Sequence, residues 1–323
     1  MKKQHNILIT GGAGYLGSYI SEMLLENDLV DSRLIIYSRD ELKHFDLKLK
    51  IGGNPKVKFV IGDVRDFDRL KEAMKDVDIV IHAAAMKHVD ICEANPSECI
   101  KTNIHGTENV IKAAQDGGVK KLIFISTDKA VEPVSIYGDT KQVGEKLVLK
   151  ANSIELKTAV VRLGNLIGST GSIVDKLQKM DEQGLFFVHD AEMTRFCDSL
   201  SNAWLLIKKS VEGDYEETIL ISKLKAINIL DLTKSMTSNF IVRNENTSSE
   251  KKHEKLAADN EVNRLLENEY CFILPSSMLV RDVALEKYRS LPTSISQYRS
   301  DQVEVLNENE VVALLKKGLT KEV

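Results

Sequence analysis

The chain has no hydrophobic run long enough to cross a membrane. Its 323 residues contain no apolar stretch that approaches the ~18 to 20 residues of a transmembrane helix. Glycines follow the first short apolar segment closely, in "MKKQHNILITGGAG", so that segment does not form the core of a signal peptide. The sequence therefore predicts no membrane partner, and we expect a cytoplasmic protein.

Cysteine is scarce and is not paired. The four cysteines, Cys92, Cys99, Cys197 and Cys271, never form a C-x-x-C pattern. Such spacing predicts neither a zinc site nor a disulfide framework. We expect no metal, and we expect these thiols to be reduced and partly buried.

Basic charge is not in excess. The chain has 44 Lys and Arg against 48 Asp and Glu, which gives a formal net charge of -4. A general binder of nucleic acid or of an anionic membrane carries a basic surface, so both partner classes are disfavoured. Local basic pockets are not excluded by this argument.

Short apolar runs alternate with amphipathic stretches along the first two thirds of the chain. The runs predict strands and the amphipathic stretches predict helices. The expected strands are 6–10, 33–37, 57–61, 78–82, 121–126, 158–163 and 217–222, and the expected helices are 15–26, 67–75, 97–115 and 137–151. This order predicts an α/β fold with a doubly wound parallel sheet of the Rossmann type.

The rhythm changes after about residue 165, where elements become shorter and irregular. We predict an NADP-binding domain over residues 1–164, to which residues 190–223 return. Residues 165–189 and 224–323 are predicted to form a smaller C-terminal substrate lobe over the strand ends.

The segment "TGGAGYLG" joins the first expected strand to the first expected helix. Gly11, Gly14 and Gly17 have the spacing that lets backbone N–H groups approach a pyrophosphate and lets the helix pack on the strand. A glycine triplet also serves simple loops, but this position predicts a dinucleotide site. Neighbouring Tyr15 and Leu16 are candidate contacts.

The second strand does not end in the acidic residue that usually binds the ribose of NAD. It ends in "IIYSRDELK", where Ser38 and Arg39 offer a hydroxyl and a guanidinium suited to a 2'-phosphate. The sequence therefore favours NADP, although Arg39 is alternatively a solvated surface residue. The other candidate cofactor contacts near the strand ends are Lys43, Asp63, Val64, Ala83, Ala84 and Ala85.

"STDKAVEPVSIYGDTK" follows the fifth expected strand. Tyr137 and Lys141 lie one helical turn apart, so an ammonium can stabilise a tyrosinate and hold a nicotinamide ribose, while Thr127 supplies a hydroxyl. Asp128 and Lys129 are not required by redox chemistry alone. The alternative interpretation is a solvated Tyr–Lys pair, with Asp128 capping a turn and Lys129 in solvent.

A family resemblance extends over roughly residues 5 to 200. Its motifs are "TGGAGYLG", "YSRDELK", "GDVRD", "HAAAMKHVDICEANPSECIKTNIHGT", "STDKA", "YGDTK", "RLGNLIGSTGS" and "MTRF". Together they resemble the extended short-chain dehydrogenases and, more closely, the 5-inverting UDP-N-acetylglucosamine 4,6-dehydratases of capsule and flagellin glycan synthesis. The resemblance implies a UDP-sugar substrate, an internally recycled NADP and a homo-oligomer.

The resemblance also implies roles for individual residues. Tyr137 matches the proton acceptor for the C4 hydroxyl, Lys129 the base for the C5 proton, and Asp128 the acid that helps the C6 hydroxyl leave as water. A base requires a neutral amine, so we expect a lowered pKa for Lys129. By the same resemblance, Lys87 contacts cofactor or substrate, and Asn165 and Arg195 hold the nucleotide-sugar. Thr102 and Asn103 are expected on a helix that faces the crevice, as candidate cofactor contacts.

The chain departs from the family pattern in three places, the first of them near the expected diphosphate site. Where many members have R-P-G-E-K-x-H-E, this chain reads "NTSSEKKHE" over residues 246–254. Thr170 replaces an arginine, and Cys197 replaces a tryptophan. Two other hypotheses therefore stay open: a nucleotide-sugar 4-epimerase or 4-keto reductase on the same scaffold, and a catalytically weak NADP-binding protein that acts as a sensor or scaffold.

Overall fold

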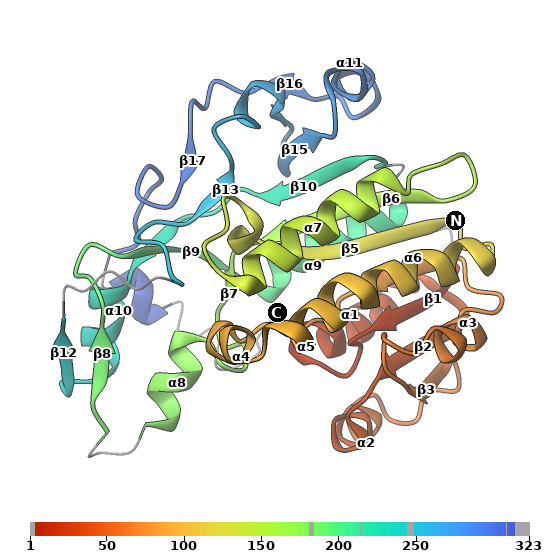
Figure 1. The fold of residues 1–323 in the computed structure, drawn as a ribbon, viewed down its shortest axis with the longest axis horizontal. Helices are drawn as coiled ribbons and strands as arrows, with labels where there is room; N and C mark the ends of the chain where they lie inside the picture. Colours follow the sequence, from red (N-terminus) through yellow and green to blue (C-terminus); the bar gives the residue numbers. More distant parts are fainter. Residues whose placement is uncertain (1–3, 181–183, 214, 244–248, 308, 314–323) are drawn as a thin grey trace.

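A ten-stranded sheet forms the centre of the molecule (Figure 1). The structure is a computed structural model that describes residues 4–180, 184–213, 215–243, 249–307 and 309–313. The strand order is β16-β14-β15-β10-β6-β5-β4-β1-β2-β3. Seven of these strands run parallel, namely β1 (His5–Thr10), β2 (Val30–Ser38), β3 (Val57–Ile61), β4 (Ile79–His82), β5 (Lys121–Thr127), β6 (Lys157–Leu163) and β10 (Thr218–Ser222). The predicted doubly wound fold is confirmed.

Both faces of this sheet are apolar because the parallel strands are covered by helices on each side. In β1, Ile7 and Ile9 pack into one core cluster while Leu8 packs into the other. The Leu8 face is covered by α3 (Phe67–Ala73), α6 (Gly106–Asp116) and α7 (Ile136–Lys150). The opposite face is covered by α1 (Tyr15–Glu26), α2 (Glu41–Lys50), α9 (Leu200–Glu212) and α11 (Met278–Lys287).

The sheet continues beyond β10 into the C-terminal part of the chain. β15 (Cys271–Pro275) pairs antiparallel with β10, and β14 (Leu266–Glu267) and β16 (Leu291–Pro292) follow. The sequence analysis predicted that all of residues 224–323 belong to the substrate lobe, whereas in the structure the strands β14, β15 and β16 of this range pair into the central sheet. The strands of this segment are short and irregularly spaced. They join the sheet because β15 forms backbone hydrogen bonds with the edge of β10.

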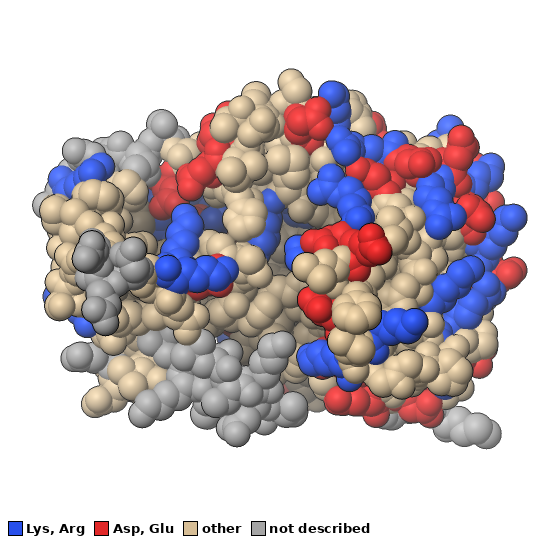
Figure 2. Space-filling model, turned by 90° about the horizontal axis from the view of Figure 1, so that it is seen from below, with Lys and Arg blue, Asp and Glu red and all other residues tan. Residues whose placement is uncertain are grey.

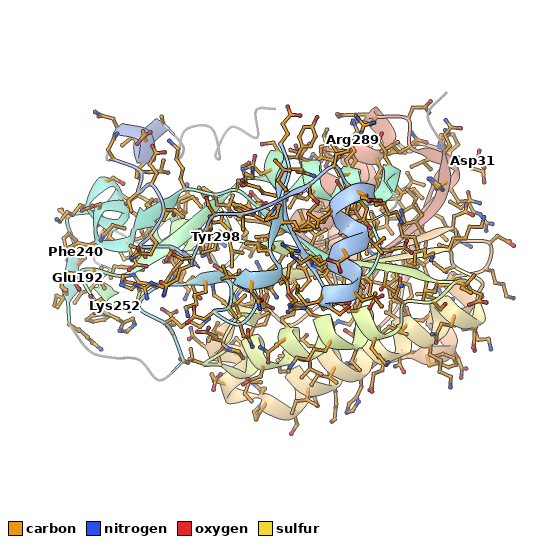
Figure 3. All side chains as sticks on the ribbon, turned by 90° about the horizontal axis from the view of Figure 1, so that it is seen from above. Asp31, Glu192, Phe240, Lys252, Arg289 and Tyr298 are labelled. Atoms are coloured by element: carbon orange, nitrogen blue, oxygen red, sulfur yellow. The ribbon has the colours of Figure 1, made fainter. Side chains whose placement is uncertain are left out.

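A smaller lobe lies at the carboxyl ends of the parallel strands. It contains a three-stranded sheet of β7 (Asn165–Leu166), β9 (Thr194–Asp198) and β11 (Ala226–Asn228), with β8 (Phe186–Val188) paired to β12 (Phe240–Val242). The helices α8 (Ile173–Lys179) and α10 (Ile229–Met236) share its apolar core. Glu192, Phe240 and Lys252 mark this end in Figure 3, opposite Asp31 at the other end of the molecule.

Three further segments lie between the sheet and the site. The segment after β4 forms α4 (Val89–Ala94), α5 (Pro96–Ile100) and a π-helical turn, η1 (Lys101–His105), before α6 begins. A 3-10 turn, η2 (Asp128–Ala130), separates β5 from α7. Near the C-terminal part, β13 (Lys255–Ala257) pairs with β17 (Tyr298–Arg299), and a 3-10 turn, η3, spans Val262–Arg264.

The surface agrees with the charge balance of the sequence. On the face drawn in Figure 2, acidic and basic side chains are interspersed and do not separate into two large fields of one sign. Within the described part of the chain, no helix combines the length and the apolar character that crossing a membrane requires.

Candidate active site

The glycine turn between β1 and α1 has no room for side chains. Gly11 has φ +70°, and a Cβ there would lie 2.8 Å from the backbone nitrogen of Ala84. A Cβ on Gly17 would lie 2.4 Å from the Gly11 carbonyl oxygen, so the helix packs directly on the turn. Gly14 caps α1 without any side-chain hydrogen bond, which leaves the N–H groups of the first turn available to an anion. This cradle fits a dinucleotide pyrophosphate.

The end of β2 lies beside this cradle and carries the predicted 2'-phosphate residues. Arg39 is exposed, with its Nη1 3.5 Å from Oδ2 of Asp63. Ser38 Oγ lies 2.5 Å from Nε2 of His44. Lys43 is exposed and pairs with Asp40 at 3.1 Å. An exposed ion pair contributes only ~0 to 1 kcal/mol to stability. Breaking the Arg39–Asp63 and Lys43–Asp40 pairs to bind a phosphate therefore costs little free energy.

Asp63, a candidate cofactor contact, is paired with Arg65, two residues further along the chain. It accepts hydrogen bonds from Nη2 of Arg65 at 2.7 Å and from Nε at 3.0 Å. Burial raises the pKa of Asp63, but these bonds and the Arg65 charge outweigh it and lower the pKa overall. Val64 is buried, and a Cβ on Gly106 would approach its Cγ2 to 2.7 Å, so Val64 packs against the start of α6.

A chain of buried hydrogen bonds fixes the end of β4. Thr10 Oγ1 lies 2.6 Å from Nδ1 of His82, and Nε2 of His82 lies 3.0 Å from Oγ1 of Thr107. Burial lowers the pKa of His82 to about 3, so the imidazole is neutral. The Ala84 N–H donates to Thr10 at 3.3 Å. The residues Ala83, Ala84 and Ala85 that follow β4 are therefore held against the glycine turn.

The π-helical turn η1 contains two of the predicted cofactor contacts, Thr102 and Asn103. Asn103 accepts from the Met86 N–H at 2.8 Å, and its amide donates to the Met86 carbonyl at 2.9 Å and to Thr140 at 3.0 Å. Asn103 thus fastens the loop after β4 to α7. Thr102 is buried, and its hydroxyl has no hydrogen-bond partner among the described residues.

Two residues of the cofactor side hold the loop after β7. The Tyr15 hydroxyl donates to the carbonyl of Ile167 at 2.9 Å, and Lys87 Nζ donates to the carbonyl of Thr170 at 2.7 Å. Burial lowers the pKa of Lys87. Leu16, next to Tyr15, packs against the core instead. The structure therefore places Tyr15 and Lys87 between the glycine turn and the substrate lobe.

Tyr137 begins α7, directly beside the end of β5. Burial raises its pKa to about 12, opposed most strongly by the positive charge of Lys129 and also by a hydrogen bond with Thr127. Lys141 lies one turn later and is buried, with Nζ 2.6 Å from the Ile125 carbonyl oxygen and 3.8 Å from the centre of the Phe124 ring. Burial lowers the pKa of Lys141 to about 7, although Glu145 opposes this.

Asp128, Lys129 and Asn165 form one cluster at the end of β5. Lys129 Nζ lies 3.3 Å from Oδ1 of Asp128 and donates to Oδ1 of Asn165 at 3.2 Å. The amide of Asn165 donates to the other oxygen of Asp128 at 3.3 Å, and Thr127 donates to Oδ1 at 2.9 Å. Asp128 is fully buried. Asp128 and Lys129, which are adjacent in the sequence, are therefore bridged by Asn165, which lies 36 positions after Lys129.

The ionisation of this pair differs from the expectation. Burial and Glu254 raise the pKa of Asp128, against the lowering effect of Lys129. Burial lowers the pKa of Lys129, but the charges of Asp128 and Glu254 outweigh it and raise the pKa overall. The predicted lowered pKa of Lys129 is wrong for the free protein, because two buried carboxylates face one ammonium.

Glu254 is a member of this cluster to which the sequence analysis assigned no role. Its carboxylate lies 3.4 Å from Lys129, 3.8 Å from Arg195 Nε and 3.3 Å from Lys251. Arg195 also pairs with Glu250 at 3.2 Å. No spacing rule connects residue 254 with residue 129, so only the fold reveals this contact. Of the segment 246–254, where the arginine, proline and glycine of the family pattern are missing, residues 246–248 lie outside the described residues.

An apolar pocket adjoins the cluster on the side of the smaller lobe. Its volume is about 500 Å³ with the space open to solvent included. Asn165, Arg195 and Cys197 line it together with Leu166, Ile167, Ser172, Ile173, Val174, Phe196, Ile227, Ile229, Leu232 and Val311. Both predicted nucleotide-sugar residues therefore lie on one pocket, between the acid–base cluster and an apolar wall.

Comparisons with known proteins agree with this arrangement. A family model described as "Polysaccharide biosynthesis protein" matches residues 7–274. A Campylobacter jejuni protein named UDP-N-acetylglucosamine 4,6-dehydratase (inverting) is 46% identical over 245 residues, which is 74% of this chain and 73% of that protein. A Rickettsia bellii protein named UDP-glucose 4-epimerase is 34% identical over 325 residues, which is 96% of this chain and 94% of that protein.

A solved structure extends the likeness over the whole chain. The X-ray structure of Pen from Bacillus thuringiensis has 31% sequence identity and a TM-score of 0.89, and the match covers 99% of both chains. The sheet order and the glycine turn define an extended short-chain dehydrogenase fold. More closely, the chain belongs to the polysaccharide biosynthesis protein family, which confirms the resemblance.

Proposed function

We propose that the protein is a nucleotide-sugar 4,6-dehydratase that converts a UDP-N-acetylhexosamine into a 4-keto-6-deoxy sugar, with inversion at C5. The first substrate to test is UDP-N-acetylglucosamine. The observation that carries this proposal is the ion pair beside Tyr137 between Asp128, whose side chain is 1% exposed, and Lys129, whose side chain is 21% exposed. A redox site alone has no use for a second acid and base, whereas loss of water from C5 and C6 needs both.

Tyr137 is the proton acceptor for the C4 hydroxyl in this proposal. The positive charge of Lys129 lowers its pKa in the free protein, against the effect of burial. Stabilising a tyrosinate with a nearby cation is what makes a phenol usable as a base near neutral pH. Thr127 and the Lys129 charge therefore offset only part of the effect of burial, which leaves the pKa of Tyr137 raised, at about 12.

The acid and the base arise together from the Asp128–Lys129 pair. In the free protein the pair is a carboxylate and an ammonium, 3.3 Å apart. Transfer of one proton from Nζ to the carboxylate breaks an N–H bond and forms an O–H bond. The product is a neutral amine that can remove the C5 proton and a carboxylic acid that can protonate the leaving C6 hydroxyl. The raised pKa of Asp128 favours this transfer, whereas the raised pKa of Lys129 opposes it.

The nucleotide end is proposed to occupy the apolar pocket beside Asn165 and Arg195. A pyrimidine ring buries apolar surface there, and the guanidinium of Arg195 suits a diphosphate. Cys197 lines this pocket where the family usually has tryptophan, which leaves more volume. We propose that the pocket tolerates a wider range of nucleobases than uracil.

NADP is the proposed cofactor, and when bound it supplies the oxidation at C4 and the later reduction at C6. The residues fit it in two respects. Gly11, Gly14 and Gly17 leave an uncapped helix start for the pyrophosphate. Arg39, just after β2, and Lys43, in the first turn of α2, are exposed cations. We also propose a cytoplasmic homo-oligomer that acts in surface glycan synthesis.

The test is a mass measurement on the nucleotide-sugar after incubation with the protein and NADP. Loss of one water, with one solvent deuterium incorporated at C5, supports the proposal. Lys129→Arg keeps the charge facing Asp128 and Glu254 but cannot become a neutral base. It should slow C5 exchange by about 100- to 10,000-fold and leave the fold intact. Tyr137→Phe should abolish both oxidation and dehydration.

A 4-epimerase is the second candidate, because a relative of that name matches 96% of this chain. Such an enzyme would use Tyr137 and retain all the atoms of the sugar. It predicts a product of unchanged mass, and Lys129→Arg would then slow the reaction only modestly. Unchanged mass together with a new C4 epimer would replace the dehydratase proposal.

A further inference from the structure

Glu254 is buried at the junction of three segments that are far apart in the sequence. Its carboxylate contacts Lys129 from η2 at 3.4 Å, Lys251 from its own loop at 3.3 Å, and Arg195 from β9 at 3.8 Å. Only 2% of the residue is exposed. A buried carboxylate stays charged only when it is paired, and here three cations pair it.

The backbone of Glu254 is fixed as firmly as its side chain. Its N–H donates to Ser300 Oγ at 3.0 Å, and the Ser300 N–H donates back to its carbonyl at 2.9 Å. Ser300 Oγ in turn lies 2.7 Å from the hydroxyl of Thr194, which precedes Arg195. The carboxylate therefore has a defined position relative to Lys129, although 125 residues separate them.

Lys129 faces two carboxylates of unequal surroundings. Asp128 is its partner in the proton transfer, and its oxygens already accept from Thr127 and Asn165. Glu254 is the second, and its negative charge holds the proton on Lys129. The other charged or titratable groups acting on Lys129 are Arg195 and Tyr137. The Glu254 charge therefore adds to the larger effect of Asp128 in holding the proton on Lys129.

We propose that Glu254 is a positioning residue that sets the distribution of the proton between Asp128 and Lys129, and hence the pH at which the base becomes available. Lys251 opposes it, because its ammonium neutralises part of the Glu254 charge. This inference rests on the proposed role of Lys129 as base, and it extends the site to a carboxylate outside the redox and elimination residues.

Two variants should shift the pH midpoint for deprotonation of Lys129 in opposite directions. Glu254→Gln keeps the size of the side chain and removes its charge, so the midpoint for deprotonation of Lys129 should fall by about one pH unit or more, a tenfold change in the equilibrium. Lys251→Met leaves Glu254 less neutralised, so the midpoint should rise. Glu250→Gln is the matched control, because Glu250 pairs with Arg195 but is more exposed.

The experiment measures Lys129 directly and then the reaction. Acetylation by acetic anhydride at fixed pH values between about 8 and 10, with quantification of the peptide that contains Lys129, reports a shift of the midpoint without any turnover, because below the midpoint the labelling rate is proportional to the fraction of neutral amine. The pH dependence of C5 deuterium exchange reports it during catalysis. A lower midpoint in Glu254→Gln and a higher one in Lys251→Met, with Glu250→Gln unchanged, support the proposal. Unmoved midpoints in both variants overturn it, whatever happens to the rate.

The acetylation arm keeps the two proposals separable. If the unmodified protein does not dehydrate the sugar but Lys129 titrates as described, the dehydratase proposal fails and the role of Glu254 stands. If the protein dehydrates the sugar and the exchange profile of Glu254→Gln keeps its midpoint while losing rate, Glu254 has a structural role only. Should Glu254→Gln fail to fold, the predicted rise in Lys251→Met decides the question.

Discussion

Replacing Lys141 with methionine should make the protein less sensitive to pH. The Lys141 ammonium is buried above the Phe124 ring, and burial lowers its pKa from 10.5 to about 7. The unfolded chain therefore binds more protons than the folded protein between these two values. Stability from this group is fully present above about pH 10.5, and it is lost as the pH falls toward 7.

The linkage relation gives the size of the effect. For pKa values of 10.5 unfolded and about 7 folded, raising the pH from about 6 to about 9 should add about 2.7 kcal/mol to the free energy of unfolding. Lys141→Met removes the titration and keeps an apolar side chain over the ring. The difference in unfolding free energy between the two proteins should therefore change by about 2 to 3 kcal/mol over this range.

Urea unfolding at both pH values, followed by circular dichroism, measures the difference. Lys146→Met is the matched control, because Lys146 is exposed on the same helix and should show no such change. Glu145 keeps its partner in the variant, since it pairs with Arg162 at 2.7 Å. Parallel pH dependence in unmodified protein and Lys141→Met would refute the assignment of a buried, weakly protonated lysine.

Two other substitutions test the ends of the site. Arg39→Ala should weaken NADP binding by about tenfold and leave NAD binding unchanged, because an exposed cation is lost from the proposed 2'-phosphate site; equal calorimetric affinities of the unmodified protein for both cofactors would contradict this. Thr170→Arg should lower the Michaelis constant more than it changes turnover, since it adds a cation for the diphosphate in both ground and transition states. An unchanged Michaelis constant would mean that Arg195 and its neighbours already suffice.

The sheet could be predicted because its strands are continuous apolar runs. Each of the runs at 6–10, 57–61 and 217–222 falls within a residue or so of an observed strand. The strands β14 and β16 could not be predicted, because each has only two residues and depends on a neighbour for its pairing. A local sequence pattern therefore predicts strands that are buried on both faces, but it does not predict short strands that form only because a neighbouring strand pairs with them.

The same distinction applies to the site. Asp128, Lys129 and Tyr137 lie within ten residues of each other, so a sequence motif contains them. Asn165 reaches the cluster because it follows β6, whose end pairs with the end of β5, and Glu254 reaches it through the return of the chain from the smaller lobe. The ionisation of Lys129 also escaped the sequence, because its direction depends on a count of buried carboxylates that only the folded structure supplies.

The antiparallel edge has a consequence for how the chain can be divided. β15 covers the hydrogen-bonding edge of β10, whose residues Ile219, Leu220 and Ile221 are buried. A fragment that stops at residue 223 would expose this edge as an apolar template for another chain. Such a fragment should aggregate on expression, so the cofactor-binding half cannot be isolated as a soluble module by simple truncation.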